Sequence, residues 1–373
     1  MVVQKTQPHV RVARFVPAHA AVVVQAAAKQ PVFLFEGGVI PAFFVFTLKK
    51  HCILELMSTS VSLSQLLGIQ HPIIVAPMFL VSNAAMIKAA LDAGATGAIP
   101  ALNYRTDEEL RAAITEIKNH SDKPFGINLI VNKSNPKLKA QLKTVCDLRV
   151  GFVITSLGSP EETIKACKPL GIKVFCDVTD VAYARKVEAL GADAVIAVNS
   201  QAGGHAGKLS AEELIPALKK ECSIPIISAG GVATRQQLDH VTQLGASGVS
   251  VGTIFIATHE APVSNEYKNA MVTYGAKDIV MTTKLSGTPC TVINTDYVKQ
   301  IGTKQNWFEK MLSKNKRLKK FMKLFTFYRG MKKLQKAAFS ATYQTVWCAG
   351  PAIEYVDKIR SVKEIIDELT NTK

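Results

Sequence analysis

The sequence has no closely spaced pair of cysteines, although it contains seven of them. A structural metal site usually requires ligands at short spacing, for example two cysteines separated by two residues. The cysteines are instead scattered along the chain, at Cys52, Cys146, Cys167, Cys176, Cys222, Cys290 and Cys348. We therefore expect reduced, mostly buried thiols in a cytoplasmic protein, with neither a disulfide framework nor a metal site.

The sequence also has no uninterrupted apolar run that is long enough to cross a membrane. The best candidate, residues 32–48, is broken by Glu36, by two glycines and by Pro41. This run lies too far from the N-terminus to be a signal peptide, and no small-residue cleavage site follows it. We expect no transmembrane segment. Residues 1–56 are interpreted as a poorly ordered leader or an over-extended N-terminus, so that the working protein begins near Met57.

The positive charge is confined to two segments of the chain. The net charge is +16, but residues 297–340 hold 13 Lys or Arg against one acid, and residues 1–56 hold six against two. The rest of the chain has equal numbers of acidic and basic side chains. The basic character therefore belongs to appendages and not to the main body of the protein.

The segment 314–336 interleaves aromatic and apolar residues with lysines. This pattern is typical of an amphipathic helix whose apolar stripe packs on the body while its lysines remain in water. The alternative is that the segment binds an acidic carrier, an anionic surface or a membrane. Nucleic acid is the less favoured partner, because the charge does not extend over the body.

Eight short apolar runs rich in Val and Ile recur from residue 72 onward. They lie at residues 72–78, 95–101, 124–131, 150–157, 173–178, 194–199, 225–231 and 248–256. The stretches between them have helical spacing and capping residues, so strands alternate with helices and a parallel sheet is predicted. Eight units of about 25 residues favour a closed (β/α)8 TIM barrel over an open doubly wound sheet. No run is followed by the glycine spacing of a dinucleotide-binding unit.

These patterns divide the chain into four predicted parts. A leader occupies residues 1–56 and the barrel residues 57–295. A basic helical insertion follows at 296–345, and residues 346–373 form a C-terminal helix that returns to the barrel.

One glycine-rich stretch directly follows the sixth apolar run. It reads NSQAGGHAG at residues 199–207 and contains a single histidine, His205. Barrel enzymes place their chemistry at the carboxyl ends of the strands, which is where this loop would lie. The same edge would hold Pro77-Met78, Asn128, Asp177, Gly230-Gly231 and Gly252-Thr253. The alternative for the histidine is a flexible loop with a surface side chain, and for the glycines a set of tight turns.

Several segments resemble those of one known family, and they occur in the same order and at similar spacing. They are IIVAPM, PFGINL, GADAVIAVNSQAGGHAG, IPIISAGGVATRQQL and GASGVSVGTIF. The resemblance is to the nitronate monooxygenases, also called 2-nitropropane dioxygenase-like proteins. It spans residues 60–295 and extends to the C-terminal segment GPAIEYVDKIRSVKEIIDEL. The resemblance implies a (β/α)8 flavoprotein that binds FMN.

The resemblance also implies roles for single residues. His205 would be the catalytic base, and Gly203 would let the flavin ring approach its loop. Asn128 and the backbone around Met78 would contact the ring or the ribityl chain. The FMN phosphate would be held by Gly230, Gly231, Ser250, Val251, Gly252 and Thr253.

Some positions depart from the family pattern. Gln201 stands where the family usually has glutamate, Val198 where many members have glutamine, and Phe79-Leu80 where glycines are frequent. These changes alter the lining of a pocket more than the site of the cofactor. These departures therefore leave the identity of the substrate undetermined.

Three functions therefore remain. The first is an FMN-dependent nitronate monooxygenase, which oxidises alkyl nitronates or nitroalkanes with O2 to a carbonyl compound and nitrite. The second is an NAD(P)H-dependent reductase of a quinone or an enoyl thioester, similar to the enoyl-acyl carrier protein reductase of this superfamily. The third is a non-catalytic flavin-binding protein. The sequence leaves the electron donor, the substrate and the oligomeric state undetermined.

Overall fold

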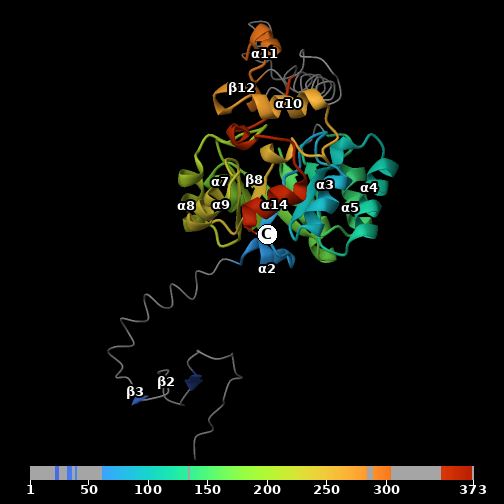
Figure 1. Ribbon diagram of the computed structural model, residues 1–373. Helices are drawn as coiled ribbons and strands as arrows, with labels where there is room; N and C mark the ends of the chain where they lie inside the picture. The colour runs from blue at the N-terminus through green and yellow to red at the C-terminus, as the bar shows by residue number, and fades with distance from the viewer. Residues whose placement is uncertain are drawn as a thin grey trace, which may run out of the picture. The chain divides into compact units, whose positions relative to one another are not determined.

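The computed structural model describes residues 61–132, 135–283, 289–303 and 346–371, together with three short strands near the N-terminus (Figure 1). The chain separates into two units, Met1–Thr59 and Ser60–Lys373. In the first unit β1 (Val22–Val24), β2 (Val32–Phe35) and β3 (Gly38–Val39) form an antiparallel sheet in that order. The predicted leader otherwise falls outside the described residues, as does the basic segment 314–336.

Eight parallel strands of the second unit close into a barrel. In chain order they are β4 (Ile73–Val75), β5 (Thr96–Pro100), β6 (Gly126–Ile130), β7 (Phe152–Ser156), β8 (Lys173–Val178), β9 (Ala194–Val198), β10 (Ile226–Ala229) and β11 (Gly248–Val251). Each strand pairs with the next, and β11 pairs with β4 to close the ring. The predicted (β/α)8 barrel is confirmed, and the open doubly wound sheet is wrong.

Helices surround the barrel and alternate with its strands. They are α3 (Ala84–Asp92), α4 (Asp107–His120), α5 (Leu138–Asp147), α6 (Glu161–Cys167), α7 (Val181–Ala189), α8 (Ala211–Glu221) and α9 (Arg235–Gln243). The C-terminal α14 (Val362–Thr370) packs against α3 and α9 and so takes the eighth position of the ring (Figure 1). The helix position that belongs to β11 is therefore filled by α14, which begins more than 100 residues later in the sequence.

Polar residues at their N-termini determine where most of these helices begin. Thr106 accepts a hydrogen bond from the Glu109 N–H, and the Glu109 side chain bonds back to the Thr106 N–H. The same capping box starts α8, α9 and α14. Such a cap contributes about 1 kcal/mol, because it satisfies N–H groups that the helix itself leaves unpaired.

The N-terminal end of the barrel is filled with apolar side chains. Phe152 and Phe175 stack inside it with ring centroids 5.0 Å apart, and Ile74 and Ile196 belong to the same buried cluster. The short helix α2 (Leu63–Leu67) adds buried leucines to this cluster from below. Because this end is closed, the space for a ligand is left at the carboxyl ends of the strands.

Additional elements lie at that carboxyl end. They are η3 (Thr253–Phe255), α10 (Asn265–Thr273), η4 (Ala276–Asp278), β12 (Ile279–Thr282), β13 (Cys290–Ile293), α11 (Asp296–Ile301) and η5 (Pro351–Tyr355). In Figure 1, α10, β12 and α11 lie at the opposite end of the barrel from α2. Buried Trp347 stacks on Tyr267 of α10 and ties the returning chain to this layer. None of the helices in the described ranges is long and apolar enough to cross a membrane.

Candidate active site

A cavity of about 1380 Å³ opens at the carboxyl ends of the barrel strands. All ten residues that the sequence proposed for the site line it: Met78, Asn128, Gly203, His205, Gly230, Gly231, Ser250, Val251, Gly252 and Thr253. Small-molecule sites usually occupy about 300–1,000 Å³. The cavity is therefore large enough for a flavin and a second ligand together.

Hydrogen bonds fix the loop that carries His205. Gly204 has φ +77, a conformation that favours glycine, and its carbonyl accepts from the Thr291 N–H at 2.7 Å. The Thr291 hydroxyl donates to the Ala202 carbonyl at 2.9 Å. A Cβ on Gly207 would lie 2.2 Å from the Val198 carbonyl oxygen. These glycines thus serve the close packing of the loop, while His205 itself is exposed, as the surface-histidine alternative expects.

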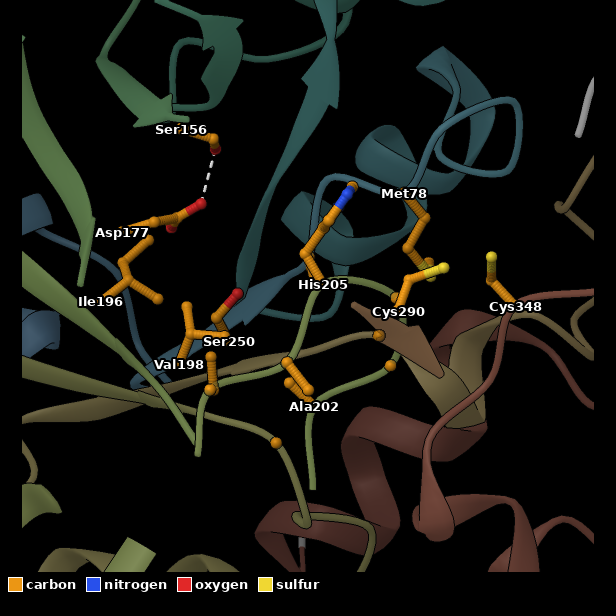
Figure 2. A pocket seen from close by; sticks show the side chains of 18 of the residues that line it. Met78, Ser156, Asp177, Ile196, Val198, Ala202, His205, Ser250, Cys290 and Cys348 are labelled. Carbon is orange, nitrogen blue, oxygen red and sulfur yellow. Dashed lines mark hydrogen bonds between the residues drawn. The ribbon is translucent and has the colours of Figure 1, made fainter. Parts of the chain in front are cut away.

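His205 lines the cavity and is exposed to it, while the neighbouring protein removes part of the water around its ring (Figure 2). This partial removal from water lowers the pKa of His205 below the ordinary imidazole value. The effect favours the neutral ring at physiological pH. A neutral imidazole can accept a proton, as a general base must.

Gly230 and Gly231 follow β10 with φ +115 and φ +80. A Cβ on Gly230 would lie 2.2 Å from Asn199 Oδ1, and one on Gly231 would lie 2.1 Å from Gln201 Oε1. The backbone conformation and the neighbouring loop therefore both require glycine here. The tight-turn interpretation explains the pair without a ligand, so a phosphate contact at these residues is an additional hypothesis.

Gly252 and Thr253 follow β11 and have different surroundings. A Cβ on Gly252 would meet Met78 Sδ at 3.3 Å and Ala76 Cβ at 3.5 Å, so the fold itself tolerates a small side chain. Its φ of −118 does not require glycine either. The Thr253 hydroxyl accepts from the Gly350 N–H at 3.0 Å and keeps its own proton to donate.

Some of the polar groups of Met78 and Asn128 already have hydrogen-bond partners in the protein, and others do not. The Met78 N–H donates to Ser82 Oγ at 2.9 Å, and the Met78 carbonyl accepts from the N–H groups of Val81 and Ser82. The side chain of Met78, more than its backbone, is thus left for a ligand. Asn128 Nδ2 donates to Ser156 Oγ at 2.8 Å, whereas Asn128 Oδ1 has no partner in the described part of the chain.

Ser250 points its hydroxyl into the cavity (Figure 2). No described residue hydrogen-bonds to this oxygen. Uncommitted groups on Ser250 and Asn128, with the backbone of Gly252 in the cavity wall, are what a polar cofactor with a phosphate would use. The described residues therefore fit FMN.

The sequence assigned no role to two further features of the cavity. Asp177 was placed at this edge without a role, and it receives a hydrogen bond from Ser156 Oγ at 2.5 Å. Burial raises the pKa of Asp177 to about 6, although the Ser156 bond acts in the opposite direction. The only sequence signal was an acid inside the apolar run at residues 173–178.

The other feature is a pair of thiols in the cavity wall. Cys290 and Cys348 both line the cavity, and Val292 of β13 pairs with Cys348. A hydrogen bond between the thiols lowers the pKa of Cys290, and it raises that of Cys348 together with burial. Nothing in the sequence indicates this pair, because the basic segment separates its members.

The family model for nitronate monooxygenase matches residues 60–372. A (3aS,4S,5R,7aS)-5-hydroxy-7a-methyl-1-oxo-octahydro-1H-indene-4-carboxyl-CoA dehydrogenase of Rhodococcus jostii is 32% identical over 240 residues, 64% of this chain and 67% of that protein. A nitronate monooxygenase of Pseudomonas aeruginosa is 30% identical over 270 residues, 60% of this chain and 77% of that protein.

Solved structures show the same architecture. FabK from Thermotoga maritima superposes with a TM-score of 0.72 at 28% identity, and the match covers 84% of this chain and 96% of FabK. Nitroalkane oxidase from Streptomyces ansochromogenes gives 0.69 at 21% identity over 83% and 96% of the two chains. The second likeness supports the fold alone.

Proposed function

The chain belongs to the nitronate monooxygenase family, whose members are flavin-dependent oxidoreductases, and on this basis we propose that it is an FMN-dependent nitronate monooxygenase. It would oxidise alkyl nitronates or nitroalkanes with O2 to a carbonyl compound and nitrite. The observation that carries this proposal is the position of His205, a base with a lowered pKa in the wall of the cavity that fits FMN.

The cofactor would be held by residues from three sides of the cavity. Its phosphate would lie against Gly230, Gly231, Ser250, Val251, Gly252 and Thr253. Asn128 Oδ1 would accept a hydrogen bond from the ring system, and Gly203 and the Met78 side chain would bound it. When bound, FMN supplies the electron-accepting and O2-reducing chemistry that protein side chains lack.

His205 would remove the proton from the carbon that bears the nitro group. This step requires a base that is neutral at working pH and within reach of the carbon–hydrogen bond. The fixed loop after β9 holds the imidazole in the cavity wall, and partial desolvation by the neighbouring protein lowers its pKa. A substrate that is already a nitronate would bypass this step.

A second candidate is an NAD(P)H-dependent reductase of an enoyl thioester or a quinone. The likeness to FabK and to a CoA-thioester dehydrogenase favours it, as does a cavity larger than a small nitroalkane requires. We propose that an acidic carrier would then bind the basic segment 314–336, because the charges are complementary.

One sequence of measurements separates these candidates. The purified protein should show the absorbance of an oxidised flavin. Addition of a nitroalkane or its nitronate under air should release nitrite, whereas anaerobic NADH or NADPH should leave the flavin oxidised. Rapid bleaching by the reduced nicotinamide would instead identify the reductase, and a flavin that responds to neither would indicate the non-catalytic binding protein.

A further inference from the structure

Three neighbouring strands contribute polar side chains to the cavity. Asn128 is the middle residue of β6, whereas Ser156 ends β7 and Asp177 is the last but one residue of β8. The stacked Phe152 and Phe175 come from earlier positions of β7 and β8. The barrel interior therefore changes from apolar to polar at the floor of the cavity.

The three side chains form a hydrogen-bonded row with a defined direction. Asn128 Nδ2 donates to Ser156 Oγ at 2.8 Å. Ser156 Oγ donates in turn to Asp177 Oδ2 at 2.5 Å (Figure 2). Oδ2 is thus an acceptor. The second carboxyl oxygen, Oδ1, has no hydrogen-bond partner among the described residues, and Asp177 lines the cavity.

No cation compensates the Asp177 carboxyl in the part of the chain that the structure describes. The groups that act on its pKa are its burial and the Ser156 hydroxyl. Burial is the main cause that raises the pKa of Cys176 on the same strand and of Tyr183 of α7, and the Asp177 charge raises both further. The other charged or titratable groups near this side of the cavity include Asp180, His205 and Lys208, which also line it.

Such a carboxyl lowers the stability of the barrel. An unpaired charge inside a protein is unfavourable, and an apolar residue at the same place would extend the layer of Phe175. Buried titratable groups with altered pKa values and no stabilising partner concentrate at functional sites. A function at the cavity would explain why an acid is present here.

Resting on the function proposed above, we propose that Asp177 is a second proton-transfer residue of this site, which donates from Oδ1 to a substrate oxygen while His205 takes the proton from carbon. The substrate class is a compound whose carbon–hydrogen bond is next to a nitro or carbonyl group. Both groups become oxyanions when that carbon loses its proton.

Every proton and electron pair in this step is accounted for. The proton leaves the substrate carbon for the His205 ring nitrogen, and the electron pair of the carbon–hydrogen bond becomes a double bond to nitrogen or to the carbonyl carbon. The displaced π pair resides on oxygen and takes the proton of Asp177 Oδ1. His205 is then an imidazolium and Asp177 a carboxylate, held by the O–H of Ser156. No electron acceptor is needed for this exchange.

An inert oxyanion tests this role without turnover. Isobutanoate has the same number and connectivity of heavy atoms as propane-2-nitronate but no nitro group, so it reports binding by the holoenzyme without a reaction. Its dissociation constant would be measured by calorimetry from pH 5.5 to 8 on the full chain, on Asp177→Asn, and on His205→Asn. Asp193→Asn is the matched control, because Asp193 caps the Val174 N–H and does not line the cavity.

We expect affinity in the unaltered chain to fall about tenfold per pH unit above the point where the Asp177 carboxyl ionises. The dependence should persist in His205→Asn and Asp193→Asn and disappear in Asp177→Asn. An infrared carboxyl band that titrates near pH 6 should be absent from Asp177→Asn alone.

Two results would overturn the proposal. One is a pH dependence that survives in Asp177→Asn and is lost in His205→Asn, which would assign it to the imidazole. The other is a shift of the flavin absorbance in Asp177→Asn without any ligand, which would show that the Asp177 carboxyl contacts the cofactor and not the substrate. A chain that releases no nitrite but keeps the isobutanoate dependence would remove the proposed function and leave the oxyanion site in place.

Discussion

At the scale of single residues, His205 combines accessibility from the cavity with a lowered pKa. The neutral form, which is the base, therefore persists to a lower pH than for a histidine fully surrounded by water. We predict that the acidic limb of kcat/KM for a nitroalkane has its midpoint below about 6.5, the ordinary value, and that kcat/KM declines again as the proton-donating Asp177 carboxyl ionises. A midpoint above that value would contradict the effect of burial.

Replacement of His205 separates a base from a packing residue. His205→Asn should retain FMN, because it leaves the surrounding glycines in place. The rate with a neutral nitroalkane should fall by about 10² to 10⁴, the usual loss for a positioned base. The rate with the pre-formed nitronate should fall much less. Equal losses on the two substrates would remove His205 from the proposed role.

Gly252 can be replaced to test the cofactor site without an effect of the replacement on folding. In Gly252→Ala the new Cβ would meet Met78 and Ala76 at ordinary or slightly tight distances, so folding should be unaffected. Gly252→Val adds branches that obstruct the approach of a phosphate to the backbone. We expect FMN to bind about tenfold more weakly or worse in the valine variant, measured by flavin release on dilution. Full FMN occupancy in a folded Gly252→Val protein would count against this phosphate site.

Asp177 also has a consequence for stability. Its pKa in the folded protein is about 6, above the value near 4 of an unfolded chain. The folded state therefore binds the extra proton between these values, and stability decreases as pH rises through this window. Asp177→Asn should be more stable than the unaltered chain at pH 8, by on the order of 2 kcal/mol, and equally stable at pH 3.5. Denaturant unfolding at the two pH values measures both differences.

At the scale of elements, α14 completes the barrel from the far end of the chain. Ile366 of this helix is fully buried, whereas Lys363 extends into solvent and pairs with Asp367 at 2.6 Å. We predict that Ile366→Ala lowers the free energy of unfolding by about 2–5 kcal/mol, because it leaves a cavity between packed helices. Lys363→Ala should change it by less than about 0.5 kcal/mol. Similar melting temperatures for the two variants would show that α14 is not part of the cooperative unit.

The elements were largely predictable from local patterns. Thr106 and Glu109 stand three residues apart before an apolar helical pattern, and they form the capping box that begins α4. The position of α14 was expected only as a helix that returns to the barrel. Its packing against α3 and α9 could not be derived, since no local signal specifies which neighbours a distant helix meets.

At the scale of the whole molecule, the first 59 residues form a unit separate from the barrel. The barrel unit contains its own closing helix, its complete strand ring and the whole cavity lining. We propose that a chain beginning at Met57 folds alone, with the melting temperature and flavin content of the full chain. A clearly lower melting temperature for the shortened chain would show that residues 1–56 contribute to the fold.

The sequence by itself determined the barrel, because apolar runs recur at a regular interval, and the family, because five segments resemble its members in order. The ten residues for the cofactor and the base are what that resemblance implies, and their roles stay a prediction. Only the tertiary structure brought Asp177 to Ser156, which comes from a different strand, and Cys290 to Cys348 across the intervening segment. These contacts depend on barrel closure and strand register, which no short stretch of sequence encodes. The acid inside an apolar run was visible from the start, but only the folded barrel showed that its carboxyl lacks a cationic partner in the described chain.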